Sequence, residues 1–201
     1  MPAQRFARLK AALFLLCLMP LLWLAYSAFS HTLGANPIEA ITRTLGDWAL
    51  RFLLIVLAVT PLRRLPGLGA LARLRRMLGL YAFFYALLHL LGYVVLDQFF
   101  DWAAIGADIL KRPYITIGMA AFALLVPLAA TSTDRMIRRL GGHRWRQLHR
   151  LVYLAAALGV VHYYLLVKAD TREPIIYGVT LALLLGLRLP WRRWTEQGLR
   201  L

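Results

Sequence analysis

The sequence predicts an all-α membrane protein, a six-transmembrane-helix bundle with short loops and both termini in the cytoplasm. Hydrophobic residues make up 61% of the 201 residues and charged residues only 16%, and the mean hydropathy is +0.63. This composition leaves too little polar surface for a soluble domain. Loops rich and poor in basic residues also alternate along the chain, and this alternation predicts the orientation.

Each predicted span is close to the roughly 20 residues that cross a hydrocarbon core about 30 Å thick. The six apolar stretches cover residues 11–30, 44–61, 77–96, 114–131, 150–167 and 174–190. The first stretch is preceded by basic residues and ends in small residues, so it could be a cleavable signal peptide. Its apolar run is long for a signal peptide, and this favours a retained helix. We expect a single transmembrane domain over residues 1–201, with no separate soluble domain.

The positions of the basic residues predict which loops face the cytoplasm. Most of the 24 arginines and lysines precede the first span, follow the sixth, or lie in the loops after the second and fourth spans. Short basic loops remain in the cytoplasm, so we expect a multi-pass protein of the bacterial inner membrane whose acidic loops face outward. The net charge of +15 is then explained by topology and by anionic membrane lipid, and not by a nucleic-acid partner.

Two of the five histidines, His89 and His162, lie inside predicted spans. His89 follows Arg76 by 13 residues and His162 follows Arg150 by 12 residues. Both spans begin in the cytoplasm, so the two side chains should lie at the same depth, roughly 18 to 20 Å above these arginines. An ionisable residue in a membrane helix is a candidate functional residue by default.

Two imidazoles at one depth suit the axial positions of a haem iron, because a neutral imidazole binds the metal without carrying charge into the membrane. Cys17 is the only cysteine, and Asp47 is expected at a helix end, so the spans cannot complete a four-ligand zinc or copper site. Hydrogen bonding between helices is the alternative explanation for each histidine alone. We therefore predict that His89 and His162 bind haem iron.

His149 lies 13 residues before His162, at the cytoplasmic edge of its span. That spacing places the two side chains about 140° apart around an ideal helix, and the facing positions on the third span are Arg75 and Arg76, neither of which is a haem ligand. A second haem on His149 and a simple interfacial histidine are both consistent with the sequence. His31 and His143 are expected in loops.

The run Trp145–Tyr153, followed by His162 and Tyr163, resembles the fifth-helix pattern of the ferric reductase-like transmembrane family. The resemblance implies a b-haem electron-transfer subunit that does not itself act on the final substrate. It implies His89 and His162 as iron ligands and, more tentatively, His149. It also implies FMN, electron supply from the quinone pool or a cytosolic flavin reductase, and delivery to the periplasmic molybdopterin subunit MsrP, which repairs methionine sulfoxide in envelope proteins.

The sequence offers other predictions and alternatives. About 11 residues follow the last span, so we expect another protein to supply the flavin or nicotinamide chemistry. The outward loop with Asp97, Asp101 and the aromatic residues Phe99, Phe100 and Trp102 is the expected docking surface. A small proton-coupled transporter or channel, with the membrane histidines as a proton relay, and a scaffold without a cofactor are the competing functions.

Overall fold

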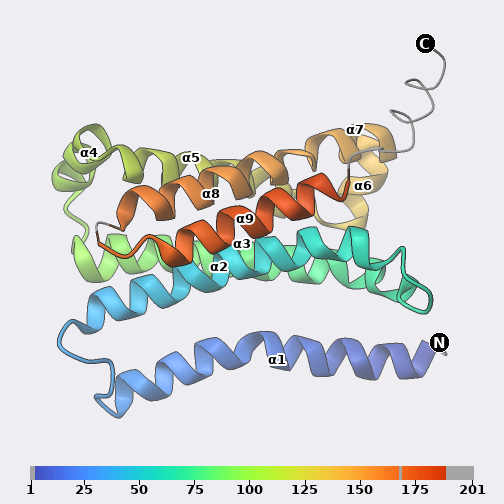
Figure 1. Cartoon of the computed structure of the whole chain (residues 1–201), viewed down its shortest axis with the longest axis horizontal. Coiled ribbons are helices and arrows are strands. Elements are labelled where there is room, and N and C mark those ends of the chain that lie inside the picture. Colours follow the sequence, from blue (N-terminus) through green and yellow to red (C-terminus); the bar gives the residue numbers. More distant parts are fainter. Residues whose placement is uncertain (1–2, 168, 189–201) are drawn as a thin grey trace.

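The computed structural model describes residues 3–167 and 169–188, and this part of the chain is helical throughout, without a strand. The helices lie side by side along one direction (Figure 1). They are α1 (Ala3–Phe29), α2 (Pro37–Leu62), the 3-10 turn η1 (Gly69–Leu74), α3 (Arg75–Leu91), the π-helical segment η2 (Gly92–Asp97), α4 (Trp102–Lys111), α5 (Pro113–Ala130), α6 (Asp134–Leu140), α7 (Gly142–Leu148), α8 (Leu151–Leu166) and α9 (Arg172–Gly186).

Five helical segments of the described residues are long and apolar enough to cross a membrane. They are Gln4–Phe29, Pro37–Leu62, Gly69–Asp97, Pro113–Ala130 and Gly142–Leu166. They correspond to the first five predicted spans. The sixth predicted span corresponds to α9, which has 15 residues; residues 189 and 190 of that span, and the basic residues Arg192, Arg193 and Arg200, lie outside the described residues.

The two ends of the bundle differ. Figure 1 places the start of α1, the turn after α2, and helices α6 and α7 at one end, and α4 at the other. We call the first the basic end, because its loops carry a group of arginines: Arg63, Arg64, Arg73, Arg135, Arg138, Arg139, Arg144 and Arg146. We call the other the α4 end.

Helix α2 begins seven residues before the predicted start at residue 44, so that boundary was wrong. Asn36 caps the helix by accepting a hydrogen bond from the backbone N–H of Glu39, and Pro37 occupies the first turn, where a missing N–H costs nothing. Glu39 pairs with Arg43 one turn later at 3.3 Å. These polar residues interrupt the apolar run without interrupting the helix. Asp47 is consequently inside a candidate span, and not at a helix end as predicted.

The core lies between α2, α3, α5 and α8, and α1 is at the edge of the bundle (Figure 1). Phe52 of α2 stacks on two α3 tyrosines, Tyr81 and Tyr85. The hydroxyls of these tyrosines donate to the α1 carbonyls of Phe14 and Cys17, each at 2.8 Å. A backbone carbonyl can accept two hydrogen bonds, so these contacts attach α1 to α3 while the backbone hydrogen bonds of α1 remain in place.

Arg51 is a charged residue inside the span formed by α2. Its Nε donates to the Tyr177 hydroxyl of α9 at 2.8 Å, and its guanidinium lies 5.0 Å from the Trp48 ring centroid. A membrane arginine needs such partners, because leaving it unpaired in hydrocarbon is costly. Arg51 thereby joins α2 to α9.

Candidate functional site

His89 of α3 and His162 of α8 face each other inside the bundle. Their ring centroids are 6.1 Å apart and their planes are inclined by 77°. Two imidazole nitrogens bound to one metal ion are about 4 Å apart, because each bond is about 2.0 Å long. The ring separation therefore suits one metal ion between two histidines, and the matching depth predicted from the spacing brings the two side chains together.

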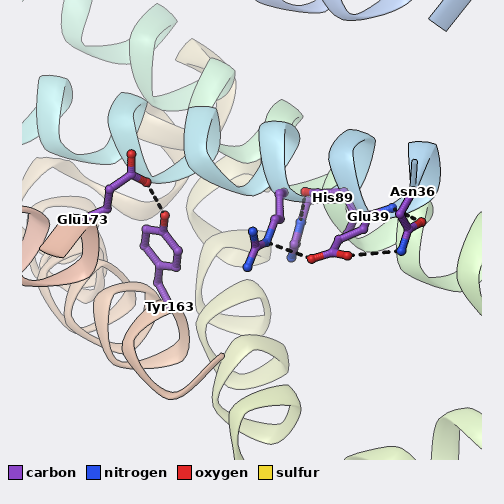
Figure 2. Close-up of polar contacts among 7 residues, drawn as sticks. Asn36, Glu39, His89, Tyr163 and Glu173 are labelled. Atoms are coloured by element: carbon purple, nitrogen blue, oxygen red, sulfur yellow. Dashed lines mark hydrogen bonds and ion pairs between the residues drawn. The ribbon is translucent and has the colours of Figure 1, made fainter. Parts of the chain in front are cut away.

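Each of the two rings is held by its Nδ1 atom. His89 Nδ1 is 2.8 Å from the Thr42 carbonyl of α2 (Figure 2), and His162 Nδ1 is 2.7 Å from the Tyr114 carbonyl of α5. A carbonyl oxygen can only accept, so each Nδ1 carries the hydrogen and donates it. In a neutral imidazole the other nitrogen, Nε2, is then the bare one that can bind a metal, and such a bond to a carbonyl is how proteins orient metal-binding histidines.

Two glycines make room for these rings. A Cβ on Gly46 would lie 2.9 Å from Nδ1 of His89, and a Cβ on Gly118 would lie 2.8 Å from Nδ1 of His162. Each glycine follows the residue whose carbonyl accepts the hydrogen bond, Thr42 or Tyr114, by four residues on the same helix. The space left by the missing side chain, which we call the notch, therefore lies on the same helix face as the acceptor. The two halves of the site are built in the same way.

Neither glycine was predicted from the sequence. The available signal is that Gly46 follows Thr42, and Gly118 follows Tyr114, by four residues. This spacing can be interpreted only once the pairing of α2 with α3 and of α5 with α8 is known. Gly79 is a useful contrast, because a Cβ there would meet nothing within 4 Å.

The histidines lie in a cavity of about 960 Å³, which is in the size range of cofactor sites. Its walls include Leu50, Leu53, Leu125 and Ala155, which are buried apolar residues. Polar and charged residues line it as well: Asn36, Glu39, Thr42, Arg43, Asp47, Asp97, Arg112, Asp170 and Glu173. The site thus combines apolar walls with a set of charged groups, several of them at helix ends and in loops.

The donor set fits a haem and not a bare metal ion. Within the described part of the chain, no group of three or more His, Cys, Asp or Glu side chains could hold a metal. Two opposed imidazoles whose Nε2 atoms are left for a metal would instead suit an iron whose other four ligands come from a porphyrin.

Two carboxylates, Glu173 of α9 and Asp47 of α2, line the cavity. Tyr163, the residue after His162, donates its hydroxyl to Glu173 at 2.5 Å (Figure 2). Asp47 on α2 lines the same cavity and interacts electrostatically with Arg51 and Glu173. Contrary to the sequence prediction, one predicted span therefore does carry a carboxylate near the histidines.

His149 is not part of this pair. It ends α7 at the basic end, where its ring stacks on Trp145 with centroids 3.9 Å apart. Its Nε2 is 3.1 Å from Thr131 Oγ1, and the single hydroxyl hydrogen of Thr131 points to the Pro127 carbonyl at 2.6 Å. The hydroxyl therefore accepts from Nε2–H. His149 presents the opposite tautomer from the other two histidines, with its Nε2 already engaged.

Of the two arginines that the spacing placed opposite His149, Arg75 is close enough to act on it electrostatically. Arg76 bonds to Asp134 at the start of α6. His31 and His143 are exposed, as expected for loop histidines, although His143 belongs to α7.

Comparison with known proteins agrees with this architecture. The model of the family described as "Ferric reductase like transmembrane component" matches residues 45–160. The chain belongs to the ferric reductase-like transmembrane family. Together with the five apolar helices, this membership shows a multi-pass membrane protein.

Relatives of this ferric reductase-like chain share most of its length. One from Rhodospirillum rubrum is 62% identical over 180 residues, which is 90% of this chain and 86% of the relative. One from Caulobacter vibrioides is 55% identical over 90% of this chain and 84% of the relative, and one from Azospira oryzae is 57% identical over 92% and 80%. Each is named protein-methionine-sulfoxide reductase heme-binding subunit MsrQ. The six predicted short spans and the stretch Arg76–Leu80 before His89 also predict this more specific similarity, which the relatives confirm.

Proposed function

We propose that this chain holds a b-type haem between His89 and His162 and passes electrons across the bacterial inner membrane to MsrP, a periplasmic molybdopterin methionine-sulfoxide reductase. The observation that carries the proposal is the facing pair of histidines, each with Nδ1 bound to a carbonyl and Nε2 left for iron. The names of the relatives, which are heme-binding subunits, support it.

The bound haem would supply a one-electron carrier. The chain's own residues do the positioning: the carbonyls of Thr42 and Tyr114 fix the ring orientations, and the notches at Gly46 and Gly118 admit the rings. The buried apolar walls keep water from the metal and favour an uncharged imidazole.

The proposal includes six spans in one domain over residues 1–201, with both termini in the cytoplasm. The arginine-rich loops of the basic end support this orientation. The α4 end then faces the periplasm and MsrP, and the basic end faces the electron donor, which is the quinone pool or a cytosolic flavin reductase. FMN is included because of the family resemblance.

The proposal places one haem in the chain, and a second haem on His149 is the alternative that a separate test decides. Nε2 of His149 would have to leave Thr131 to bind iron, and the facing cation, Arg75, is not an iron ligand. The first haem requires no such rearrangement.

A proton-coupled transporter or channel is the second candidate function. Asp47 and Arg51 favour it, because both are ionisable residues within the α2 span and such residues mark proton and ion pathways. Proton flux into liposomes that contain the purified protein, compared with Asp47→Asn, separates this function from the first. Flux without haem would favour the transporter.

The direct test is the reduced minus oxidised visible spectrum of the purified wild type, His89→Ala and His162→Ala. We expect a low-spin b-type signal that both variants lose, because each removes one axial ligand. His143→Ala, which changes an exposed histidine, is the control and should keep the signal. A wild type that remains colourless after haem is added would contradict the proposal.

A further inference from the structure

Two arginines line the cavity that holds the histidine pair, and each is close in sequence to one half of the site. Arg43 follows Thr42, the acceptor for His89, and Arg112 precedes Tyr114, the acceptor for His162, by two residues. The cation on each side is therefore positioned by the same backbone segment that positions a histidine.

The remaining charged residues of the described lining are all acidic: Glu39, Asp47, Asp97, Asp170 and Glu173. A b-type haem carries two propionate carboxylates at one edge of the ring. These carboxylates would be repelled by the acidic residues, and an ionised carboxylate among the buried leucines would lose its hydration without compensation. Among the described residues of the lining, Arg43 and Arg112 alone offer them positive charge.

Each arginine has donors to spare. Arg43 contacts Glu39 through Nε at 3.3 Å. Arg112 contacts Asp108 through Nε at 3.1 Å, and one of its terminal nitrogens donates a long hydrogen bond of 3.5 Å to the Tyr114 hydroxyl. A guanidinium has five N–H donors, so each can keep its protein partner and bind a propionate through its terminal nitrogens. The two side chains are 54% and 51% exposed, so a propionate there also keeps part of its hydration.

We propose that Arg43 and Arg112 bind the two haem propionates, and that this fixes the orientation of the porphyrin, with its carboxylate edge toward these two arginines and its apolar edge toward Leu53 and Leu125. This inference rests on the proposed function. It adds two cofactor-binding residues to the histidines and places the polar edge of the haem beside the α4 end, because Arg112 lies between α4 and α5.

The test compares two forms of the cofactor. Apoprotein is titrated with haem b and with haem dimethyl ester, in which both propionates are esterified and uncharged. We expect the wild type to bind haem b more tightly than the ester. Arg43→Gln and Arg112→Gln should each weaken haem b binding about 10-fold, as expected for the loss of a charge-assisted hydrogen bond, and should leave ester binding unchanged.

Two controls separate this effect from general damage. Lys111→Gln removes the same charge from the residue beside Arg112 that does not line the cavity, and it should bind both cofactors like the wild type. Arg43→Lys and Arg112→Lys keep the charge and should recover part of the preference for haem b.

The outcomes are distinct. Equal affinity of the wild type for haem b and its ester, or equal weakening of both in the arginine variants, would overturn the propionate assignment and leave the histidine site intact. A wild type that binds neither cofactor would overturn the proposed function and this inference with it.

Discussion

A Cβ atom on Gly118 would lie 2.8 Å from Nδ1 of His162, closer than side-chain carbons approach one another or a ring in folded proteins. The glycine therefore decides whether the imidazole can reach the Tyr114 carbonyl. Gly46 has the same relationship to His89, at 2.9 Å. In both cases the nearest atom belongs to a ring that is already held by a hydrogen bond, so it cannot move away without losing that bond.

We expect Gly118→Ala and Gly46→Ala to lower the haem content sharply. The added methyl group would displace the ring and leave a buried N–H without its acceptor, which costs about 1–3 kcal/mol. Haem per protein, measured by absorbance after purification, checks this prediction. Gly79→Ala is the matched control: it lies in α3, has open space around it, and should keep its haem. Full haem content in Gly118→Ala would contradict the role of the notch.

We expect His149→Ala to keep the low-spin signal and a ratio of one haem per chain. The His149 Nε2 is engaged by Thr131, and the ring belongs to the basic end, away from His89 and His162. The measurement is the ratio of haem to protein in the wild type and the variant. A ratio near two that falls by one in His149→Ala would assign a second haem to this residue.

We expect the acidic loop at the α4 end to support docking of the partner. Phe99 and Phe100 have left-handed backbone angles, with φ of 46° and 62°. Both rings are exposed, and that of Phe100 lies beside Trp102. Such strained, exposed aromatic residues are often found at interaction sites. Asp97→Asn combined with Asp101→Asn should slow electron transfer to MsrP, measured as the rate of haem reoxidation by the partner.

The choice of asparagine in this variant follows from the structure. Asp101 caps α4 by accepting from the Ala104 N–H at 2.9 Å, and replacing it with lysine would remove the cap as well as the charge. Asparagine keeps the cap. Asp134→Asn is the control, because it removes a carboxylate charge at the opposite, basic end of the bundle. An unchanged rate in the double variant would exclude a docking role for these carboxylates.

We expect one contact at the basic end to depend on pH. The hydrogen bond and charge of Arg76 hold the pKa of Asp134 below its usual value, so the folded state binds a proton less readily than the unfolded chain. The contact therefore stabilises the folded protein above the ordinary pKa of an aspartate, about 3.9. This stabilisation is lost as the pH falls through the lowered pKa of Asp134 in the folded protein.

The measurement for this contact is the difference in Tm between the wild type and Asp134→Asn. A small difference at neutral pH should shrink as the pH falls below about 4. Arg76→Gln should have the same effect as Asp134→Asn, and the double variant should add little to either. A difference that persists unchanged at low pH would show that the stabilisation is not electrostatic.

The sequence by itself determined the class of the protein and the approximate positions of five spans. The physical reason is that an apolar run of about 20 residues has the length of a helix that crosses the hydrocarbon core. It also predicted that His89 and His162 share a depth, since the helical rise converts residue spacing into distance. The resemblance of Trp145–Tyr153 to the ferric reductase-like family was confirmed, because the pattern is one continuous run, from the end of α7 into the start of α8, and can be found without knowledge of packing.

Only the tertiary structure decided how the site is built. Thr42 and His89 are 47 residues apart in sequence, and Tyr114 and His162 are 48 apart, so neither hydrogen bond nor glycine notch can be read from local periodicity. The start of α2 is a different case: the Asn36 cap and the Glu39–Arg43 pair are local contacts, and the apolar pattern missed them because polar residues interrupt the apolar run without ending the helix. The tautomer of each histidine depends on which acceptor another helix presents to its ring, and that is a property of packing alone.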